Sequence, residues 1–259
     1  MKILCIGDVV SAEGRDCLLK HLPALKREHR PDFVIVNGEN AALGNGIDRG
    51  SMQEILAAGA DVITGGNHSF QKNGAGQVLE EMPCLLRPYN LGNTFGRGWY
   101  RAEGRMRDLL VINLQGMLSL PEIQNPFVAV DALLKEIVTP RDIVAVDFHA
   151  EATSEKQAMG YFLDGRVSLV FGTHTHVPTA DECILPHGTG YITDIGMTGA
   201  TYSVLGKAVE PCVHNFVTFG DSEKRMPIRD AQGACALCGI VAEFDDTSKH
   251  CIHICRIKK

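Results

Sequence analysis

Short apolar runs that end on glycine or on polar residues recur along this 259-residue chain, and they constrain its fold more than any other feature. Residues 3–6, 33–36 and 62–64 are apolar or nearly so, and each run has the length of a buried β-strand. Leucines at helical spacing follow the first run over residues 15–26, and a second helix is expected over about residues 49–58. Apolar strands that alternate with helices predict a parallel sheet whose faces are covered by helices.

The second half of the chain continues this pattern and adds a two-stranded tail. Three more runs are expected as buried strands, at residues 109–113, 143–148 and 169–172. Residues 127–138 are expected as a helix. Residues 184–197 look like strand and turn, with 194–199 as a loop. At the end of the chain, residues 234–243 and 251–257 predict two strands joined by a turn.

Composition limits the class of protein. With 45% hydrophobic residues, the chain can bury a sizeable core, and we expect residues 1–259 to form one domain. The net charge of −6 argues against a broad surface for extended nucleic acid. The first residues turn acidic too quickly for a signal peptide, and no apolar run approaches the roughly 20 residues that cross a bilayer. We therefore expect a cytoplasmic protein without a membrane partner.

Nine cysteines are spread along the chain without the spacing of a disulfide framework, which favours reduced thiols. Cys235 and Cys238 form a Cys-x-x-Cys pair, and a zinc or redox site with Cys251, His253 and Cys255 is one interpretation. The other is structural, because the last three residues alternate with isoleucines on one face of a predicted strand, where cysteine fills space as a small apolar residue. We favour packing for these cysteines.

Residues that bind metals or carry protons stand where five predicted strands end. They are Asp8, Glu39, Asn40, Asn67, His68, His149, His174 and His176. Each also has a structural explanation, since aspartate and asparagine are common in turns and at helix caps. A preference of these residues for turns does not explain why residues able to bind a metal follow all five strands. Because ligands gather at the carboxyl ends of parallel strands, we expect these side chains to line one edge of the fold.

The mixture of ligand types indicates the chemistry. Carboxylate, amide and imidazole groups without thiolate suit manganese, iron or zinc in a catalytic site. Seven candidate ligands are too many for one ion that keeps a position open, but they fit two ions with Glu39 as the bridge between them. Paired ions are a recurring device for hydrolysing phosphate esters.

Longer motifs surround these positions and carry a resemblance. The short motifs at residues 7–8, 38–40, 66–68, 148–149 and 172–176 resemble those of the calcineurin-like metallophosphoesterases. The longer segments 6–10, 37–42, 147–156 and 191–199 more specifically resemble the bacterial YmdB-like branch. Val10 stands where the wider superfamily has a histidine, and Glu39 stands where it has an aspartate. Both departures are typical of the branch, in which Asn40 would supply the missing ligand.

The resemblance implies a fold and an activity. The fold would be α/β, a four-layer α/β/β/α sandwich with helices outside two central sheets. The activity would be that of a dinuclear phosphodiesterase on small nucleotides, foremost 2',3'-cyclic nucleotides, with 3',5'-cyclic AMP as a further candidate. Iron or manganese would be the metals, with zinc as an alternative, and the chain would form a homo-oligomer.

The resemblance also implies a role for each site residue. Asp8, Asn40 and His176 would hold one ion, whereas the other ion would be held by Asn67, His149 and His174. Glu39 would bind both ions. A hydroxide that bridges the ions would attack phosphorus, and His68 would act as the general acid that protonates the leaving oxygen.

Two other functions remain open at this point. A broad-specificity phosphomonoesterase or nuclease could use the same ions, and a panel of substrates would separate it from a cyclic-nucleotide phosphodiesterase. A regulatory protein could instead use the site to sense a nucleotide without turnover. The histidine at position 68 counts against the sensor, because binding alone needs no general acid.

Overall fold

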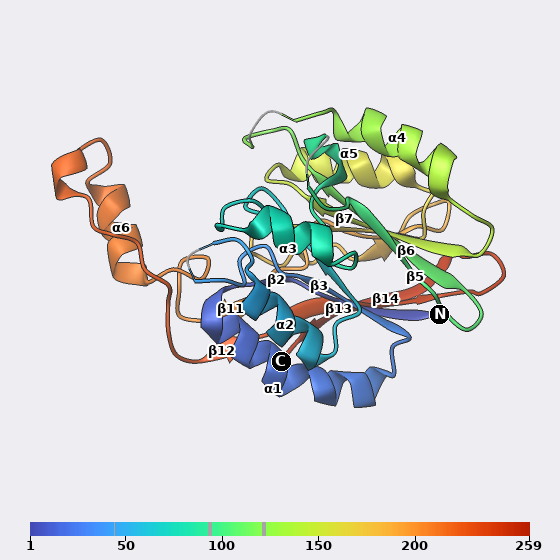
Figure 1. Ribbon diagram of the computed structural model, residues 1–259, viewed down its shortest axis with the longest axis horizontal. Helices are drawn as coiled ribbons and strands as arrows, with labels where there is room; N and C mark the ends of the chain where they lie inside the picture. Colours follow the sequence, from blue (N-terminus) through green and yellow to red (C-terminus); the bar gives the residue numbers. More distant parts are fainter. Residues whose placement is uncertain (44, 93–94, 121–122) are drawn as a thin grey trace.

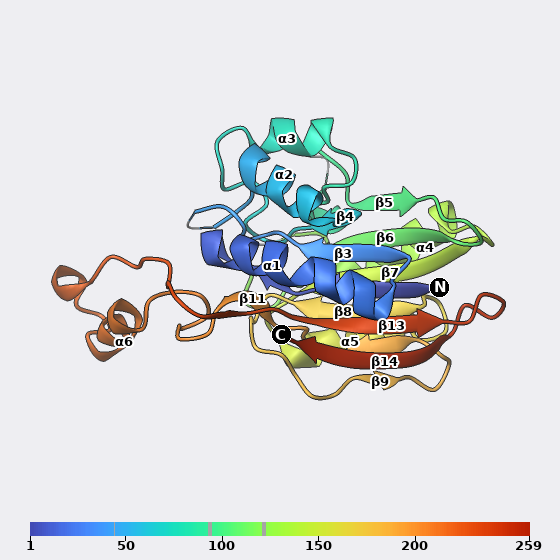
Figure 2. The ribbon, with the colours of Figure 1, turned by 90° about the horizontal axis from the view of Figure 1, so that it is seen from below.

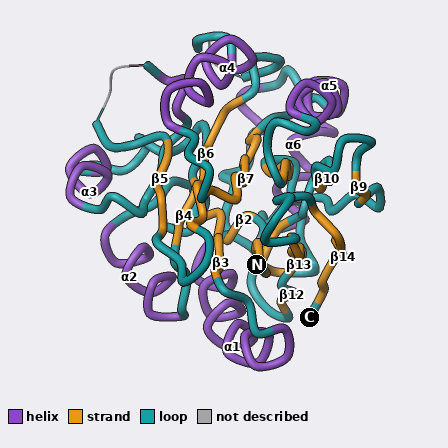
Figure 3. Tube along the Cα trace, turned by 90° about the vertical axis from the view of Figure 1, so that its right-hand side faces the viewer, coloured by secondary structure: helices purple, strands orange, loops and turns teal. Residues whose placement is uncertain are grey.

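The computed structural model describes residues 1–43, 45–92, 95–120 and 123–259. Two central β-sheets face each other, and helices cover their outer faces, which confirms the expected four-layer α/β/β/α sandwich (Figure 1). Figure 3 shows α1 (Ser11–His29) and α2 (Arg49–Ala58) on one side of the strands, and α4 (Pro126–Ile137) and α5 (Thr153–Leu163) on the opposite side. A shorter helix, α3 (Ala75–Glu81), lies near α2.

The first sheet has five strands in the order β14–β13–β1–β3–β4. Its parallel part consists of β1 (Lys2–Ile6), β3 (Phe33–Asn37) and β4 (Val62–Thr64). The predicted tail ribbon, β13 (Cys238–Phe244) and β14 (Cys251–Lys258), is antiparallel and joins the sheet beside β1. The first apolar run, β1, therefore pairs directly with β13 near the end of the chain.

The second sheet has six strands in the order β5–β6–β7–β8–β10–β9. Its four central strands are parallel: β6 (Asp108–Gln115), β7 (Asp142–His149), β8 (Leu169–Thr173) and β10 (Gly190–Ile192). The antiparallel edges are β5 (Trp99–Ala102) and β9 (Cys183–Ile184). The carboxyl ends of β7 and β8 carry the histidine motifs.

A third, small sheet corrects one expectation. Residues 194–199 were expected as a loop, yet β11 (Met197–Ala200) is a strand between β2 (Asp8–Val9) and β12 (Cys235–Ala236). The backbone of Met197 pairs with that of Asp8, so tertiary pairing outweighs the turn-forming sequence. This sheet fixes the segment that carries Asp8.

The packing explains why the strands are apolar on both faces. Alternate residues of a strand point to opposite sides. Ile3 and Cys5 lie in the layer between the two sheets, whereas Leu4 and Ile6 pack in the layer beneath α1 and α2. A third buried layer lies between the second sheet and its helices α4 and α5. Each central strand is therefore covered twice.

All nine cysteines are free, and those of the tail pack within the sheets. Over the described part of the chain, the only group of acidic, histidine or cysteine side chains close enough to hold a metal ion is Glu39 with His149 and His174. The Cys-x-x-Cys pair therefore belongs to no such group. No helix within the described ranges is long and apolar enough to span a membrane.

Residues 201–234 form an arm that leaves the body of the protein and carries α6 (Val209–Val217) outward (Figures 1 and 2). The Thr201 N–H donates to the Ala234 carbonyl at 2.8 Å and closes the base of the arm. Apolar side chains on the arm are open to solvent, with Phe216, Val217 and Phe219 exposed by 75%, 80% and 88%. A surface of this kind is typical of a protein interface.

Candidate metal centre

The carboxyl ends of strands from both central sheets meet at one rim. The segments that follow β3 and β4 of the first sheet contribute Glu39, Asn40, Asn67 and His68. Asp8 comes from β2 of the small third sheet, directly after β1. The second sheet contributes His149 at the end of β7, and His174 and His176 after β8. All eight predicted site residues are linked by contacts below 4 Å. The structure therefore brings all eight residues together at one edge of the fold.

Glu39 lies at the centre of this group and is fully buried. Its Oε1 is 2.9 Å from His68 Nδ1 and 3.1 Å from His149 Nε2. Burial alone would raise the pKa of the Glu39 carboxyl, but the two imidazoles outweigh it and hold that pKa well below its ordinary value. A Cβ at Gly66 would overlap both Glu39 and His149, so only glycine lets the backbone after β4 pass this close.

His149 forms one half of the centre with three neighbours. Its Nε2 is 3.1 Å from Asn67 Oδ1 and 3.1 Å from His174 Nδ1. The ligand atoms of Glu39, His149 and His174 all lie within 4.8 Å of one another. Burial lowers the pKa of His174 to about 3, helped by the charge of His149, so its imidazole is neutral and able to bind a metal.

Asp8, Asn40 and His176 form the other half. His176 Nε2 is 3.2 Å from Asn40 Nδ2 and 3.8 Å from Asp8 Oδ1. The opposite nitrogen, His176 Nδ1, lies 3.1 Å from the carbonyl of Leu205 in the arm. A carbonyl only accepts, so Nδ1 carries the hydrogen and Nε2 presents its lone pair to the site.

This arrangement fits metal ions. Among the described residues, Asp8 Oδ1 and Glu39 Oε2 are buried without a hydrogen-bond partner, which is costly unless a cation binds there. The Nε2 of His149 faces two oxygen acceptors, Glu39 Oε1 and Asn67 Oδ1. Burial disfavours the charged imidazole, yet the Glu39 carboxylate raises the pKa of His149 to about 9. Positive charge between these atoms is therefore favourable, whether a proton or a metal ion supplies it.

The loop that carries His174 and His176 is strained. The two residues have φ values of 96° and 64°, in the left-handed region that non-glycine residues rarely adopt. Both side chains reach the site, as expected, but from a left-handed loop rather than from an extended strand. The His174 N–H donates to Asp8 Oδ2 at 3.2 Å and ties this loop to β2 in the small third sheet.

Lys156 and Asp194, which were not among the predicted site residues, form a buried ion pair that contacts this loop. Lys156 Nζ donates to Asp194 Oδ2 at 2.6 Å, and both side chains are almost fully buried. The same oxygen accepts from the N–H and the hydroxyl of Thr175, while Asp194 Oδ1 accepts from the Gly196 N–H at 2.8 Å. Both residues lie within the segments 147–156 and 191–199 that carry the family resemblance, and this was the one sign in the sequence that they belong to the site.

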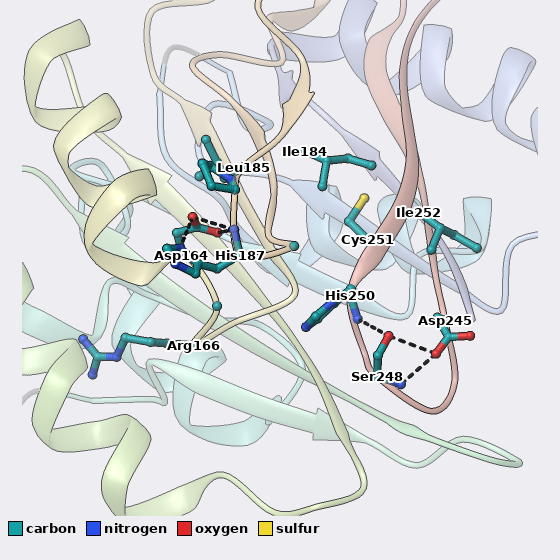
Figure 4. A pocket seen from close by; sticks show the side chains of 13 residues that line it. Asp164, Arg166, Ile184, Leu185, His187, Asp245, Ser248, His250, Cys251 and Ile252 are labelled. Atoms are coloured by element: carbon teal, nitrogen blue, oxygen red, sulfur yellow. Dashed lines mark hydrogen bonds and ion pairs between the residues drawn. The ribbon is translucent and has the colours of Figure 1, made fainter.

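A large concave surface lies elsewhere. A cavity of about 930 Å³ is lined by residues that include Asp164, His187 and His250 (Figure 4). It adjoins the amino ends of β8 and β10, whereas the predicted ligands follow carboxyl ends. Its Asp164 carboxylate is already paired with His187 Nδ1 at 2.9 Å. The chemistry of the side chains, not the size of the hollow, therefore identifies the candidate site.

Two sequence comparisons bear on the family of this chain. The family model described as "YmdB-like protein" matches residues 4–257. A curated relative from Bacillus subtilis, named 2',3'-cyclic-nucleotide 2'-phosphodiesterase, is 44% identical over 99% of this chain and 96% of its own length.

Two solved structures share the whole architecture. A hypothetical protein from Thermus thermophilus superposes with a TM-score of 0.92 at 38% identity, covering 100% of this chain and 99% of the other. A structure described as a novel phosphatase from Mycoplasma pneumoniae gives a TM-score of 0.92 at 35% identity, with 100% and 93% covered. The likeness extends to both central sheets.

Proposed function

The chain belongs to the YmdB-like family and is a metallophosphoesterase with phosphodiesterase activity, and from that premise we propose that it hydrolyses small cyclic nucleotides. The preferred substrates are 2',3'-cyclic nucleotides, with 3',5'-cyclic AMP as a further candidate. The observation that carries the proposal is the convergence of the eight strand-end residues around the buried Glu39 carboxylate. The name of the Bacillus subtilis relative supports the choice of substrate.

The proposed cofactors are two metal ions, iron or manganese, with zinc as an alternative. Asp8, Asn40 and His176 would hold one ion, Asn67, His149 and His174 the other, and Glu39 both. When bound, such ions activate water and neutralise charge on phosphoryl oxygens. The absence of thiolates among these ligands supports a catalytic rather than a structural metal site.

His68 is the proposed general acid. Its Nδ1 lies 2.9 Å from the Glu39 carboxylate and 3.2 Å from Asn40 Oδ1, so these two acceptors orient the ring through one nitrogen. That leaves Nε2 to carry a proton to the leaving oxygen. The His68 side chain is 22% exposed, whereas that of His149 is fully buried, which supports access of a substrate to His68.

The deciding experiment combines metal analysis with a substrate panel on one purified sample. We expect two ions per chain and product from 2',3'-cyclic nucleotides, with little from mononucleotides or oligoribonucleotides. Preference for mononucleotides would indicate a phosphomonoesterase, and preference for oligoribonucleotides a nuclease. Binding of a cyclic nucleotide without product would indicate a sensor.

Residues 1–259 are further proposed to form one domain that acts in the cytoplasm as a homo-oligomer. The occupant proposed for the apolar arm surface is a second copy of the chain. Phe216, Val217 and Phe219 are the most exposed apolar side chains of α6 and the turn after it, and burial between copies would remove them from water. Sedimentation of the purified protein measures the number of copies.

A further inference from the structure

A layer of buried polar residues lies directly beneath the candidate ligands. Asn37, Thr64, Asp147 and Thr173 come from β3, β4, β7 and β8, and all four are fully buried. Asp147 is the centre of this layer, because the side chains of the other three donate hydrogen bonds to its carboxylate. The contacts cross from one central sheet to the other.

The hydrogen-bond donors that face the Asp147 carboxylate can be assigned from their other contacts. The backbone N–H of Glu39 donates to Asn37 Oδ1 at 3.1 Å, so Asn37 Nδ2 must be the group that donates to Asp147 Oδ2 at 3.0 Å. The Thr173 hydroxyl donates its one hydrogen to Asp147 Oδ1 at 2.7 Å. No second hydrogen remains on that hydroxyl.

The assignment determines how His149 is held. Its Nδ1 is 2.8 Å from Thr173 Oγ1, and because this oxygen can only accept there, Nδ1 must carry a hydrogen. The ring is thereby oriented with Nε2 toward Glu39 Oε1, at 3.1 Å. Hydrogen bonds of this kind, from the second nitrogen of a histidine ligand, fix its tautomer and its direction.

We propose that Thr173, anchored by Asp147, is a positioning residue that sets the tautomer and orientation of His149 for metal binding. The inference rests on the metal centre of the proposed function. Thr173 is not itself a candidate ligand; its proposed role is to orient one through a hydrogen bond. Thr64 is the natural comparison, since it also donates to Asp147 but has no hydrogen bond to His149.

The test compares three variants of the full chain after removal of metal. Thr173→Val keeps the shape of the side chain but loses the hydroxyl, Thr173→Ser keeps the hydroxyl, and Thr64→Val removes the other hydroxyl that donates to Asp147. Affinity for Mn²⁺ and Zn²⁺ is measured by competition with a chelator. We expect Thr173→Val to weaken binding roughly 10–100-fold, and the other two variants to stay within about threefold of the parent.

Thermal unfolding of the metal-free variants shows whether each is folded, and Thr173→Ala replaces Thr173→Val if the valine variant is not. Equal affinity in the parent and Thr173→Val would overturn the inference, and so would an equal loss in Thr64→Val, which would indicate a general structural effect. A parent protein that takes up neither ion would overturn the proposed function together with this inference. Uptake by the parent with no loss in Thr173→Val would overturn the inference alone.

Discussion

Replacing Lys156 with methionine tests how much the loop of His174 and His176 depends on its buried support. The 2.6 Å ion pair between Lys156 and Asp194 is almost completely removed from solvent, so the variant leaves a buried carboxylate without its cation. Breaking a buried pair by removing one partner typically costs roughly 3–5 kcal/mol. Because Asp194 keeps hydrogen bonds from Thr175 and Gly196, we expect a loss near the lower end, about 3 kcal/mol.

The measurement is urea and thermal unfolding of the metal-free protein. A loss of about 3 kcal/mol corresponds to a fall in Tm of roughly 6–12 °C for a chain of this size. Lys135→Met is the matched control, because Lys135 makes a 2.6 Å ion pair with Asp131 on an exposed face of α4, and such pairs contribute roughly 0–1 kcal/mol.

A double-mutant cycle with Asp194→Asn separates the pair from its surroundings. If the two residues act as a unit, the double variant loses clearly less stability than the sum of the two single losses. Additive losses, or a cost for Lys156→Met no larger than for Lys135→Met, would refute the reasoning.

Four further outcomes are expected. His68→Ala should lower turnover of a cyclic nucleotide roughly 10²–10⁴-fold with metal content unchanged, and hydrolysis at the parent rate would assign the acid to another group. Glu39→Ala should release at least one ion per chain in elemental analysis, whereas retention of two would exclude a bridging role. Phe216→Ser should reduce the mass measured by sedimentation, and an unchanged mass would place the interface elsewhere. Alkylation of the exposed Cys183 should leave metal content and turnover unaltered, because no proposed ligand is a thiol; a loss of either would contradict this.

The site could be predicted from the sequence because its determinants are local. Each candidate ligand stands within a few residues of the end of an apolar strand, and parallel strands bring their carboxyl ends to one edge. The supporting residues were harder to predict. The role of Lys156 depends on α5, which carries its side chain under the loop, and on a contact with a residue 38 positions away. No periodicity in the sequence encodes that pairing.

The spacing of apolar residues also could not predict that the strands divide between two sheets. Strands buried on both faces have the same apolar pattern whether they form one sheet or two, so the four layers came from the resemblance to a family rather than from the pattern. The strand at Met197–Ala200 was missed for a related reason. This segment is a strand because its backbone pairs with β2 at Asp8 on one side and with β12 at Cys235 on the other. Its own residues do not favour an extended conformation.

The rim described above has candidate ligands from both central sheets, and this has a consequence for folding. In the proposed assignment, each ion is bound by residues that precede β5 together with residues that follow β6, so neither half of the chain holds a complete ligand set. Metal capture would therefore occur only after the two sheets have stacked, and bound ions would clamp the sheets together. The metal content of a preparation would then report the fraction of molecules that have completed this assembly.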